Sequence, residues 1–321
     1  MRYFVTGGAG FIGSNYVEHL FTEVEGVTSV TIYDKFTYAA NPKNYQEFTN
    51  DPRLNIIKGD ICDSNLLQNS MADHDYVVHF AAESHVDRSI EDASAFVKTN
   101  VVGAFNVLEA SHKTGIKTMI HVSTDEVYGS LPEGSADENY PLEPNSPYAA
   151  SKAASDLLAR SYFVTHGLDV RTTRCCNNYG KYQFPEKVIP VFVNKLNSGE
   201  KLPIYGDGKN VREWIHVSDH ARGIQTVLER GKSGEIYNIG TGSYLSNNEL
   251  ATEIISFMGF NDSMKSYVDD RQGHDFRYSV DTRKIESIGF KRKIDIKDGL
   301  KATIDWYANN TVWWEIEGEV K

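Results

Sequence analysis

The chain has 321 residues, of which 40% are hydrophobic and 24% charged, an ordinary mix for a globular protein with a large core. Its formal net charge of −11 argues against a nucleic-acid partner or an anionic membrane surface. The three cysteines lack zinc-binding spacing, and neither a secretory signal nor a membrane-spanning apolar run is present, so we expect a cytoplasmic protein without a metal site.

Short apolar runs alternate with helical patterns over the first half of the chain. The predicted strands are Tyr3–Thr6, Ser29–Tyr33, Asn55–Lys58, Tyr76–Phe80, Thr118–Val122 and Asp169–Arg174. The predicted helices between them include Gly13–Phe21, Val97–Thr114 and Pro147–His166. This alternation of βα units predicts an α/β fold, a Rossmann-type doubly wound sheet with mostly parallel strands.

After about Gly180 the pattern loosens, because prolines and glycines mark turns. A strand-like run at 234–240 would return to the main sheet. We therefore expect a Rossmann domain over residues 1–180, with a return near 211–240. Residues 181–321 would mainly form a smaller C-terminal lobe that binds substrate, with a cleft between the two lobes.

A glycine-rich turn follows the first predicted strand. The run Thr6–Gly13 contains glycines at 7, 10 and 13 and leads directly into a helix. Such glycines allow a tight turn and close approach of the backbone to a pyrophosphate, which the free N–H groups of the helix then face. The strand–turn–helix context makes this a dinucleotide-binding site, formed by Gly7, Gly10, Phe11, Ile12 and Gly13.

Two acidic residues end the next strands. Asp34 lies 21 positions after Gly13, where a carboxylate meets the adenosine ribose and repels the 2′-phosphate of NADP, so the cofactor is predicted to be NAD. Lys35 would soften that exclusion, and Asp34 capping a turn is the alternative. Asp60 would lie at the adenine pocket or, equally, cap a helix beginning near Asp63.

Tyr148 and Lys152 form a Y-x-x-x-K pair on a predicted helix that Ser146 and Pro147 begin. Residues at i and i+4 share one helical face, so both side chains would point into the cleft. A free tyrosine has a pKa near 10. The nearby ammonium and an oxidised nicotinamide would lower this pKa enough to make the tyrosine a base.

The run Thr124-Asp125-Glu126 follows a predicted strand, at the carboxyl edge where open α/β sheets carry out their chemistry. Two neighbouring carboxyl groups suit a division of labour, in which one stays protonated and donates while the other is ionised and accepts. Thr124 would hydrogen-bond the oxygen that Tyr148 deprotonates. The alternative is a solvated acidic turn or a helix cap, which the strand end and the Tyr148–Lys152 pair disfavour.

With these motifs the chain resembles the extended short-chain dehydrogenase/reductase family. Within that family it is most similar to the dTDP-glucose 4,6-dehydratases, over nearly the whole chain to about residue 305. The runs that carry this resemblance are Phe80–Ser89, Ser123–Gly129, Tyr182–Lys187 and Ile204–Arg212. Lys181 and Gln272 depart from it, since both stand where proline is common in the family.

The resemblance implies conversion of dTDP-glucose to dTDP-4-keto-6-deoxyglucose. Tyr148, aided by Thr124 and Lys152, would take the proton of the 4-hydroxyl while C4 gives hydride to NAD. Glu126 would then remove the proton on C5, and Asp125 would protonate the departing 6-hydroxyl. Hydride would finally return to C6.

The resemblance also implies further binding residues. Those along the cofactor would be Thr37, Asp60, Ile61, Ala81, Ala82, Thr99, Cys175 and Asn178. Arginines 212 and 271 would hold the diphosphate, and the full set facing the nucleotide sugar would be Ser84, Asn177, Glu186, Lys187, Val188, Lys201, Pro203, Tyr205, Arg212, Asn247, Arg271, His274 and Tyr278. Tyrosines more often lie in the core or on the surface than against a ligand, and this is the alternative for Tyr182 and Tyr205. The family usually pairs as a homodimer, through helices such as those near 97–114 and 147–166.

Three alternatives stay open. A sugar-nucleotide 4-epimerase shares the cofactor and the first step, but epimerases usually carry small or neutral residues at the positions of Asp125 and Glu126. A non-catalytic NAD-binding regulator would not need Thr124, Tyr148 and Lys152. A 4,6-dehydratase acting on another nucleotide sugar also fits, since the sequence does not decide between thymidine and uridine.

Overall fold

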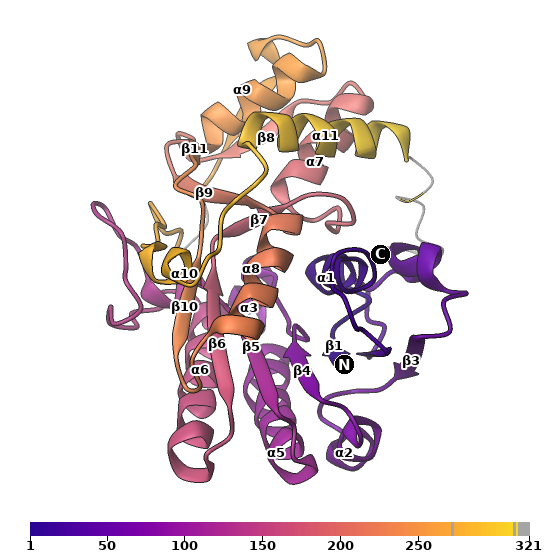
Figure 1. Ribbon diagram of the computed structural model, residues 1–321. Coiled ribbons are helices and arrows are strands. Elements are labelled where there is room, and N and C mark those ends of the chain that lie inside the picture. The colour runs from indigo at the N-terminus through magenta and orange to yellow at the C-terminus, as the bar shows by residue number, and fades with distance from the viewer. Residues whose placement is uncertain (271–272, 311–312, 314–321) are drawn as a thin grey trace.

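The computed structural model describes residues 1–270, 273–310 and 313. Within these residues the central element is a seven-stranded sheet with the order β10-β6-β5-β4-β1-β2-β3 (Figure 1). All its pairings are parallel. The order reverses direction at β1, which is the point where ligands bind in doubly wound sheets. The predicted Rossmann-type fold is confirmed.

The strands of the described chain are β1 (Arg2–Thr6), β2 (Ser29–Asp34), β3 (Leu54–Lys58), β4 (Tyr76–His79), β5 (Thr118–Thr124), β6 (Val170–Cys175), β7 (Asn177–Tyr179), β8 (Leu202–Tyr205), β9 (Val211–His216), β10 (Ile236–Ile239), β11 (Tyr244–Ser246) and β12 (Lys265–Val268). The α-helices are α1 (Phe11–Thr22), α2 (Ser64–Met71), α3 (Val86–Glu91), α4 (Ser94–Phe96), α5 (Ala104–Thr114), α6 (Pro147–His166), α7 (Val188–Asn197), α8 (Val217–Arg230), α9 (Asn247–Phe257), α10 (Arg283–Ser287) and α11 (Ile296–Asn309). Shorter helical segments are η1 (Pro42–Phe48), η2 (Val97–Gly103), η3 (Asp125–Tyr128) and η4 (Asp262–Met264).

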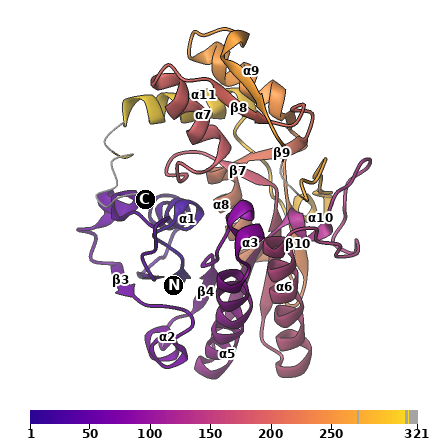
Figure 2. The same cartoon turned by 180° about the vertical axis from the view of Figure 1, so that it is seen from behind.

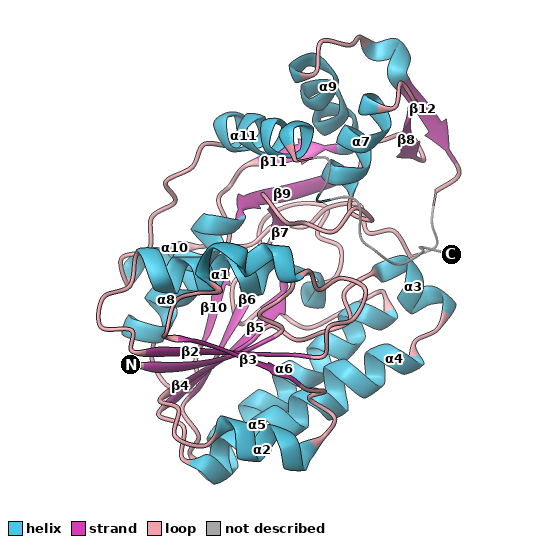
Figure 3. Ribbon diagram, turned by 90° about the vertical axis from the view of Figure 1, so that its right-hand side faces the viewer, coloured by secondary structure: helices cyan, strands magenta, loops and turns pink. Residues whose placement is uncertain are grey.

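Helices cover both faces of the main sheet (Figure 3). Helices α1 and α8 pack together on one face, while α2, α5 and α6 pack side by side on the other. Strand β5 shows why the sheet is buried on both sides, because all seven of its residues are buried. Its sequence is β-branched at Thr118, Ile120, Val122 and Thr124, and its polar and apolar residues do not alternate strictly.

A smaller lobe lies beyond the carboxyl ends of the main strands in both views (Figures 1 and 2). It contains α7, α9 and α11, with short sheets ordered β11-β9-β7 and β12-β8. Its core includes Phe192, Trp214, Ile254 and Tyr307, all of them buried. The main sheet therefore presents the carboxyl edge of its strands to this lobe.

The structure confirms the predicted strands of the first half within one or two residues and the helix Pro147–His166 at both ends. Ser146 accepts a hydrogen bond from the Ala149 N–H at 3.1 Å, and Gly167 ends the helix with φ +68°. The run at 234–240 does join the main sheet as β10, beside β6. The division into domains at residue 180 stays a prediction.

The helix predicted for Val97–Thr114 is present, but its first part is not α-helical. Residues 97–103 form the π-helix η2, and the α-helix begins only at Ala104. A π-turn inside a helix is often found at functional sites. Here it places Asn100 against the catalytic helix, as described below. Among the described residues, no helix is long and apolar enough to cross a bilayer.

The tail after α11 docks on the body through Trp313, which is 5% exposed. Its indole N–H donates to the Asn44 side-chain oxygen at 3.0 Å, and its ring lies near Tyr182, Trp306 and Tyr307. Trp313 therefore packs against the body of the protein, whereas Trp314 lies outside the described residues.

Candidate active site

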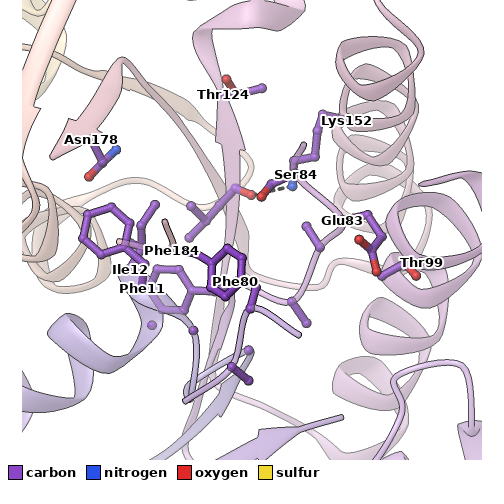
Figure 4. Close-up of a pocket in the computed structure, with 18 of the residues that line it drawn as sticks. Phe11, Ile12, Phe80, Glu83, Ser84, Thr99, Thr124, Lys152, Asn178 and Phe184 are labelled. Carbon is purple, nitrogen blue, oxygen red and sulfur yellow. Dashed lines mark hydrogen bonds between the residues drawn. The ribbon is translucent and has the colours of Figure 1, made fainter. Parts of the chain in front are cut away.

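A cavity of about 360 Å³ opens at the carboxyl edge of the main sheet, beneath the smaller lobe. This volume is within the usual range for a small-molecule site. Figure 4 shows Phe11, Phe80 and Phe184 gathered on one side, with Thr124 and Lys152 coming from other elements. The predicted site residues that line it are Gly7, Gly10, Phe11, Ile12, Gly13, Asp34, Lys35, Thr37, Asp60, Ile61, Ala81, Ala82, Ser84, Thr99, Thr124, Asp125, Glu126, Tyr148, Lys152, Cys175, Asn177, Asn178, Glu186, Lys187 and Val188.

The glycine-rich turn leaves no room for side chains. Gly7 has φ +71°, and an added Cβ would lie 2.6 Å from the Ala81 backbone nitrogen; one on Gly13 would overlap the Gly7 carbonyl oxygen. Helix α1 begins after Gly10 without a side-chain cap, so its first N–H groups lack a side-chain acceptor. The turn therefore offers backbone donors to an anion such as a pyrophosphate.

Asp34 ends β2 at the edge of this turn and is 8% exposed. Its two oxygens accept the N–H groups of Ala9 at 3.0 Å and Phe36 at 2.8 Å. The carboxylate therefore does cap a turn, and it also lines the cavity. Burial raises the pKa of Asp34, while the backbone N–H groups lower it. Each oxygen keeps a second lone pair, with which it could accept a ribose hydroxyl.

Lys35 forms an ion pair with Asp60, with 2.9 Å between Nζ and Oδ2. Asp60 also accepts the Cys62 N–H at 2.9 Å, whereas the cap of helix α2 is Asp63. The helix-cap alternative for Asp60 is therefore wrong. Since the Lys35 ammonium faces Asp60, its charge is partly neutralised and softens the exclusion of a 2′-phosphate less than the sequence suggested.

The helix α6 presents Tyr148 and Lys152 to the cavity, with exposures of 9% and 5%. Lys152 Nζ donates to the Val122 carbonyl oxygen at 2.8 Å. Burial lowers the pKa of Lys152 and raises the pKa of Tyr148 well above its usual value. The expected low pKa of Tyr148 is thus not found in the protein alone, because burial and the charge of Glu126 both raise it. A hydrogen bond with Thr124 acts in the lowering direction.

Asp125 is 3% exposed and begins the short helical turn η3 at the end of β5. Its Oδ1 accepts the Thr124 hydroxyl at 3.2 Å, while Oδ2 is buried without a hydrogen-bond partner among the described residues. Burial, followed by the charge of Glu126, raises the pKa of Asp125 well above its usual range. Burial therefore favours the protonated form of Asp125 beside a more exposed Glu126, and its 3% exposure contradicts the alternative of a solvated acidic turn.

The motifs did not single out Asn100, which fixes the loop after β4 to the catalytic helix. Its side-chain oxygen accepts the Glu83 N–H at 2.8 Å, and its amide donates to the Glu83 carbonyl and the Ser151 hydroxyl, each at 2.9 Å. The side chain is 2% exposed and lies in the π-helix η2. The π-turn thus provides this contact, for which sequence periodicity carries no signal.

Further cavity residues were not predicted, namely Tyr33, Ala39, Ala40, Gly59, Phe80, Glu83, Val122, Ser123, Cys176, Gln183, Phe184 and Trp214. Most of them neighbour predicted residues within the same strand ends and loops, so proximity in the sequence was the available signal. Trp214 is the exception, because it reaches the cavity from β9 in the smaller lobe.

A second group of predicted residues does not line this cavity. Arg212 is 6% exposed, donates to the carbonyl oxygens of Val211, Asp275 and Phe276, and lies over the Tyr278 ring. The residues of this group are Lys201, Pro203, Tyr205, Arg212, Asn247, His274 and Tyr278, whereas Arg271 and Gln272 lie outside the described residues. Their roles toward a nucleotide sugar stay predictions.

The loop with the unusual Lys181 is held by the N-terminal lobe. Lys181 Nζ pairs with Glu18 at 2.8 Å, and its carbonyl oxygen accepts from Asn15. Tyr182, with φ +74°, is buried against Trp306 and does not line the cavity. Its interpretation as a core aromatic is confirmed.

Comparison with known proteins agrees with this site. A protein-family model described as GDP-mannose 4,6 dehydratase matches residues 4–303. The chain belongs to this family. Asp125 and Glu126 therefore lie in a dehydratase-family chain, in the cavity that also holds the glycine-rich turn.

Several relatives of this family member are named dTDP-glucose 4,6-dehydratase. The one from Streptomyces niveus is 50% identical over 319 residues, which cover 98% of this chain and 95% of the relative. The solved structure of DesIV (dTDP-glucose 4,6-dehydratase) from Streptomyces venezuelae, with NAD and TYD bound, is 53% identical. It has a TM-score of 0.97 and covers 98% of this chain and 99% of its own. A UDP-glucose 4-epimerase from Thermotoga maritima with UDP-glucose has a TM-score of 0.89, is 28% identical and covers 97% of this chain and 100% of its own.

We predict that Gly7→Ala impairs dinucleotide binding in this dehydratase-family protein far more than its backbone strain alone requires. Gly115→Ala is a matched control, because Gly115 has φ +70° but nothing within 4 Å of an added Cβ. The left-handed conformation should cost both variants about 1–2 kcal/mol of unfolding free energy. Only Gly7→Ala should also weaken NAD binding, by about tenfold or more, in calorimetric titrations. Equal affinities for the two variants would contradict the close-approach role of Gly7.

Proposed function

We propose that this protein is an NAD-dependent dTDP-glucose 4,6-dehydratase, a hydro-lyase that makes dTDP-4-keto-6-deoxyglucose. The observation that carries the proposal is the buried Asp125 beside Glu126, in one cavity with Tyr148, Lys152 and the glycine-rich turn. The relatives named for this reaction support the substrate, since they are about half identical over nearly the whole chain.

The cradle fits a dinucleotide, because a Cβ at Gly7 or Gly13 would fill it and Asp34 lies at its edge. Gly7, Gly10 and Gly13, with the start of α1, would hold the pyrophosphate, and Asp34 the adenosine ribose. When bound, NAD would supply the temporary oxidation of the sugar, accepting hydride from C4 and giving it back at C6.

Tyr148 acts as the base for the sugar 4-hydroxyl and takes its proton while the C4–H bond breaks. Thr124 holds the same oxygen with its hydroxyl group. Burial raises the pKa of Tyr148 in the protein alone. The positive charge of a bound oxidised nicotinamide would favour the tyrosinate, and so would the ammonium of Lys152 on the same face of α6.

The 4-ketone acidifies the hydrogen on C5, and Glu126 removes it as a proton. The C6–O bond then breaks, and the departing oxygen takes the proton of Asp125 and leaves as water. When hydride is delivered to C6, Glu126 returns its proton to C5. Burial raises the pKa of Asp125, which favours the protonated form that can donate.

Each turnover leaves one extra proton on Tyr148 and one missing from Asp125. The Thr124 hydroxyl contacts both side chains, because it donates to Asp125 Oδ1 at 3.2 Å and hydrogen-bonds Tyr148. Transfer through Thr124 would therefore reset both groups.

The alternatives are less well supported. A 4-epimerase has the same fold at 28% identity. Epimerisation needs no acid to protonate a leaving hydroxyl, whereas the buried Asp125 is placed in the cavity to act as such an acid. A non-catalytic regulator would have no need of the buried Tyr148–Lys152 pair. Use of another nucleotide sugar is tested directly below.

The proposal predicts that the protein converts dTDP-glucose, and UDP-glucose much less, to a 4-keto product that absorbs in alkali. Glu126→Gln should still reduce bound NAD but stall before water loss, because the amide cannot accept the C5 proton. Absorbance of the reduced nicotinamide would accumulate in a single turnover, while product formation falls by about 100-fold or more. Glu253→Gln, in helix α9 of the smaller lobe, is the control and should leave both steps unchanged. Absence of product from dTDP-glucose, with NAD bound, would remove the proposal.

The two half-reactions should depend on pH in opposite directions. Reduction of NAD in Glu126→Gln should speed up as pH rises, since burial raises the pKa of Tyr148 and the base must lose its proton. Water loss should slow as pH rises through the raised pKa of Asp125, because this acid must stay protonated. Single-turnover rates measured across pH check both limbs. In Asp125→Asn the alkaline decline should disappear; its persistence would assign that decline to another group.

We also propose a cytoplasmic homodimer. Apolar side chains stay exposed along η2, α5 and α6, and those above 40% are Val97, Val102, Phe105, Leu157 and Val164. Helices α5 and α6 pack side by side, with the Phe105 and Tyr162 rings 6.3 Å apart. A continuous apolar face of this kind suits a two-fold contact between copies of the chain.

Leu157→Glu together with Val164→Glu should convert the protein to a monomer, because like charges would meet across the two-fold contact. Sedimentation velocity measures the change. Phe260→Glu, at a 41% exposed apolar residue of the other lobe, should leave the mass unchanged. A wild-type protein that sediments as a monomer would contradict the dimer.

A further inference from the structure

Glu186 lines the cavity but is held by residues that do not line it. Arg88 Nη2 lies 3.3 Å from Glu186 Oε2, and the Tyr38 hydroxyl donates to Oε1 at 3.3 Å. The Arg88 guanidinium also stacks over the Tyr38 ring, 3.9 Å from its centroid. These three side chains come from segments far apart in the chain, so folding alone brings them together.

A fourth side chain, His85, completes the support. Its Nδ1 accepts the backbone N–H of Arg88 at 3.3 Å, so the neutral ring carries its proton on Nε2. That atom lies 3.9 Å from Glu186 Oε2. Both carboxylate oxygens of Glu186 therefore face donors that do not line the cavity. Oε2 is itself buried, so Oε1 is the oxygen whose remaining lone pair can accept a substrate hydroxyl.

The helix that carries Arg88 is itself fixed to the catalytic helix. Ser89, 0% exposed, accepts the backbone N–H of Tyr148 at 3.2 Å. Tyr38 follows Asp34 in the loop after β2, and Phe184 packs edge-on against its ring at 5.2 Å. Arg88 thus connects the start of α6 to the Asp34 loop and to the loop of Glu186.

We propose that Arg88 is a positioning residue, which holds the Glu186 carboxylate in the orientation that binds the sugar by pairing with it and stacking on Tyr38. The inference rests on the proposed function, since it assigns Glu186 to the sugar of the nucleotide substrate. Arg88 itself does not line the cavity. Its planar guanidinium can stack and pair at once, which a lysine ammonium cannot.

Steady-state kinetics with dTDP-glucose test this role. Arg88→Met should raise KM by about tenfold, the effect of losing one charge-assisted contact, while kcat changes by less than about threefold. Arg88→Lys should fall between Arg88→Met and the wild type. Arg283→Met, which removes a surface arginine paired with Asp281, is the matched control and should leave KM unchanged. Tyr38→Leu should raise KM, whereas Tyr38→Phe, which keeps the ring, should do so much less.

A double-mutant cycle separates positioning from a general structural effect. If Arg88 acts through Glu186, then Arg88→Met combined with Glu186→Gln should raise KM no further than the worse single variant, within about twofold. Additive effects, or an unchanged KM in folded Arg88→Met, would overturn the inference. Thermal unfolding identifies variants that fail to fold. If Arg88→Met is one of them, the KM of Arg88→Lys decides the outcome.

Binding distinguishes failure of this inference from failure of the proposed function. In the Asp125→Asn/Glu126→Gln background, Arg88→Met should weaken dTDP-glucose about tenfold in calorimetric titrations and leave dTDP affinity within about twofold. Equal losses for both ligands, or no loss for either, would overturn the role of Arg88 even if the wild type proves inactive on dTDP-glucose. If the wild type is active and Arg88→Met binds dTDP-glucose as tightly as the protein with Arg88, the role of Arg88 is rejected and the proposed function stands.

Discussion

Burial of the Asp125 carboxyl group at the end of β5 is the constraint on which the proposed chemistry depends. Water does not solvate a side chain that is 3% exposed, and the buried Glu213 adds negative charge from β9. Ionisation is therefore costly, which raises the pKa of this acid. Because helices cover both faces of the sheet at β5, the residues at the end of this strand are already shielded from water. The more exposed Glu126 can then serve as the base one position later.

Rigid support for these groups comes from contacts behind the cavity. The catalytic helix α6 is fixed by Asn100 through Ser151 and by Ser89 through the Tyr148 N–H. Further along this helix, Asp156 pairs with Arg174 at 2.8 Å in the interior. Burial alone would raise the pKa of Asp156, but His121 and Arg174 lower it to about 2. Its charge therefore persists at neutral pH and joins the helix to the sheet. Such supporting contacts preserve the geometry that catalysis needs.

The smaller lobe contributes side chains to the cavity opposite the end of β5. Glu186 and Lys187 reach the cavity from the loop before α7, and Trp214 reaches it from β9. Relatives with dehydratase and epimerase names share the main sheet at widely different identities. This agrees with chemistry set at the end of β5 and specificity set by the opposing loops.

The sequence by itself determined the alternating strands and helices, the glycine-rich turn, and the shared face of Tyr148 and Lys152. Turns and i, i+4 spacing depend only on neighbouring residues. Only the tertiary structure decided the direction of the Tyr148 pKa, the π-turn that brings Asn100 to α6, and the pairing of Arg88 with Glu186. Burial and contacts between distant segments depend on how elements pack, and packing leaves no periodic signal in the chain.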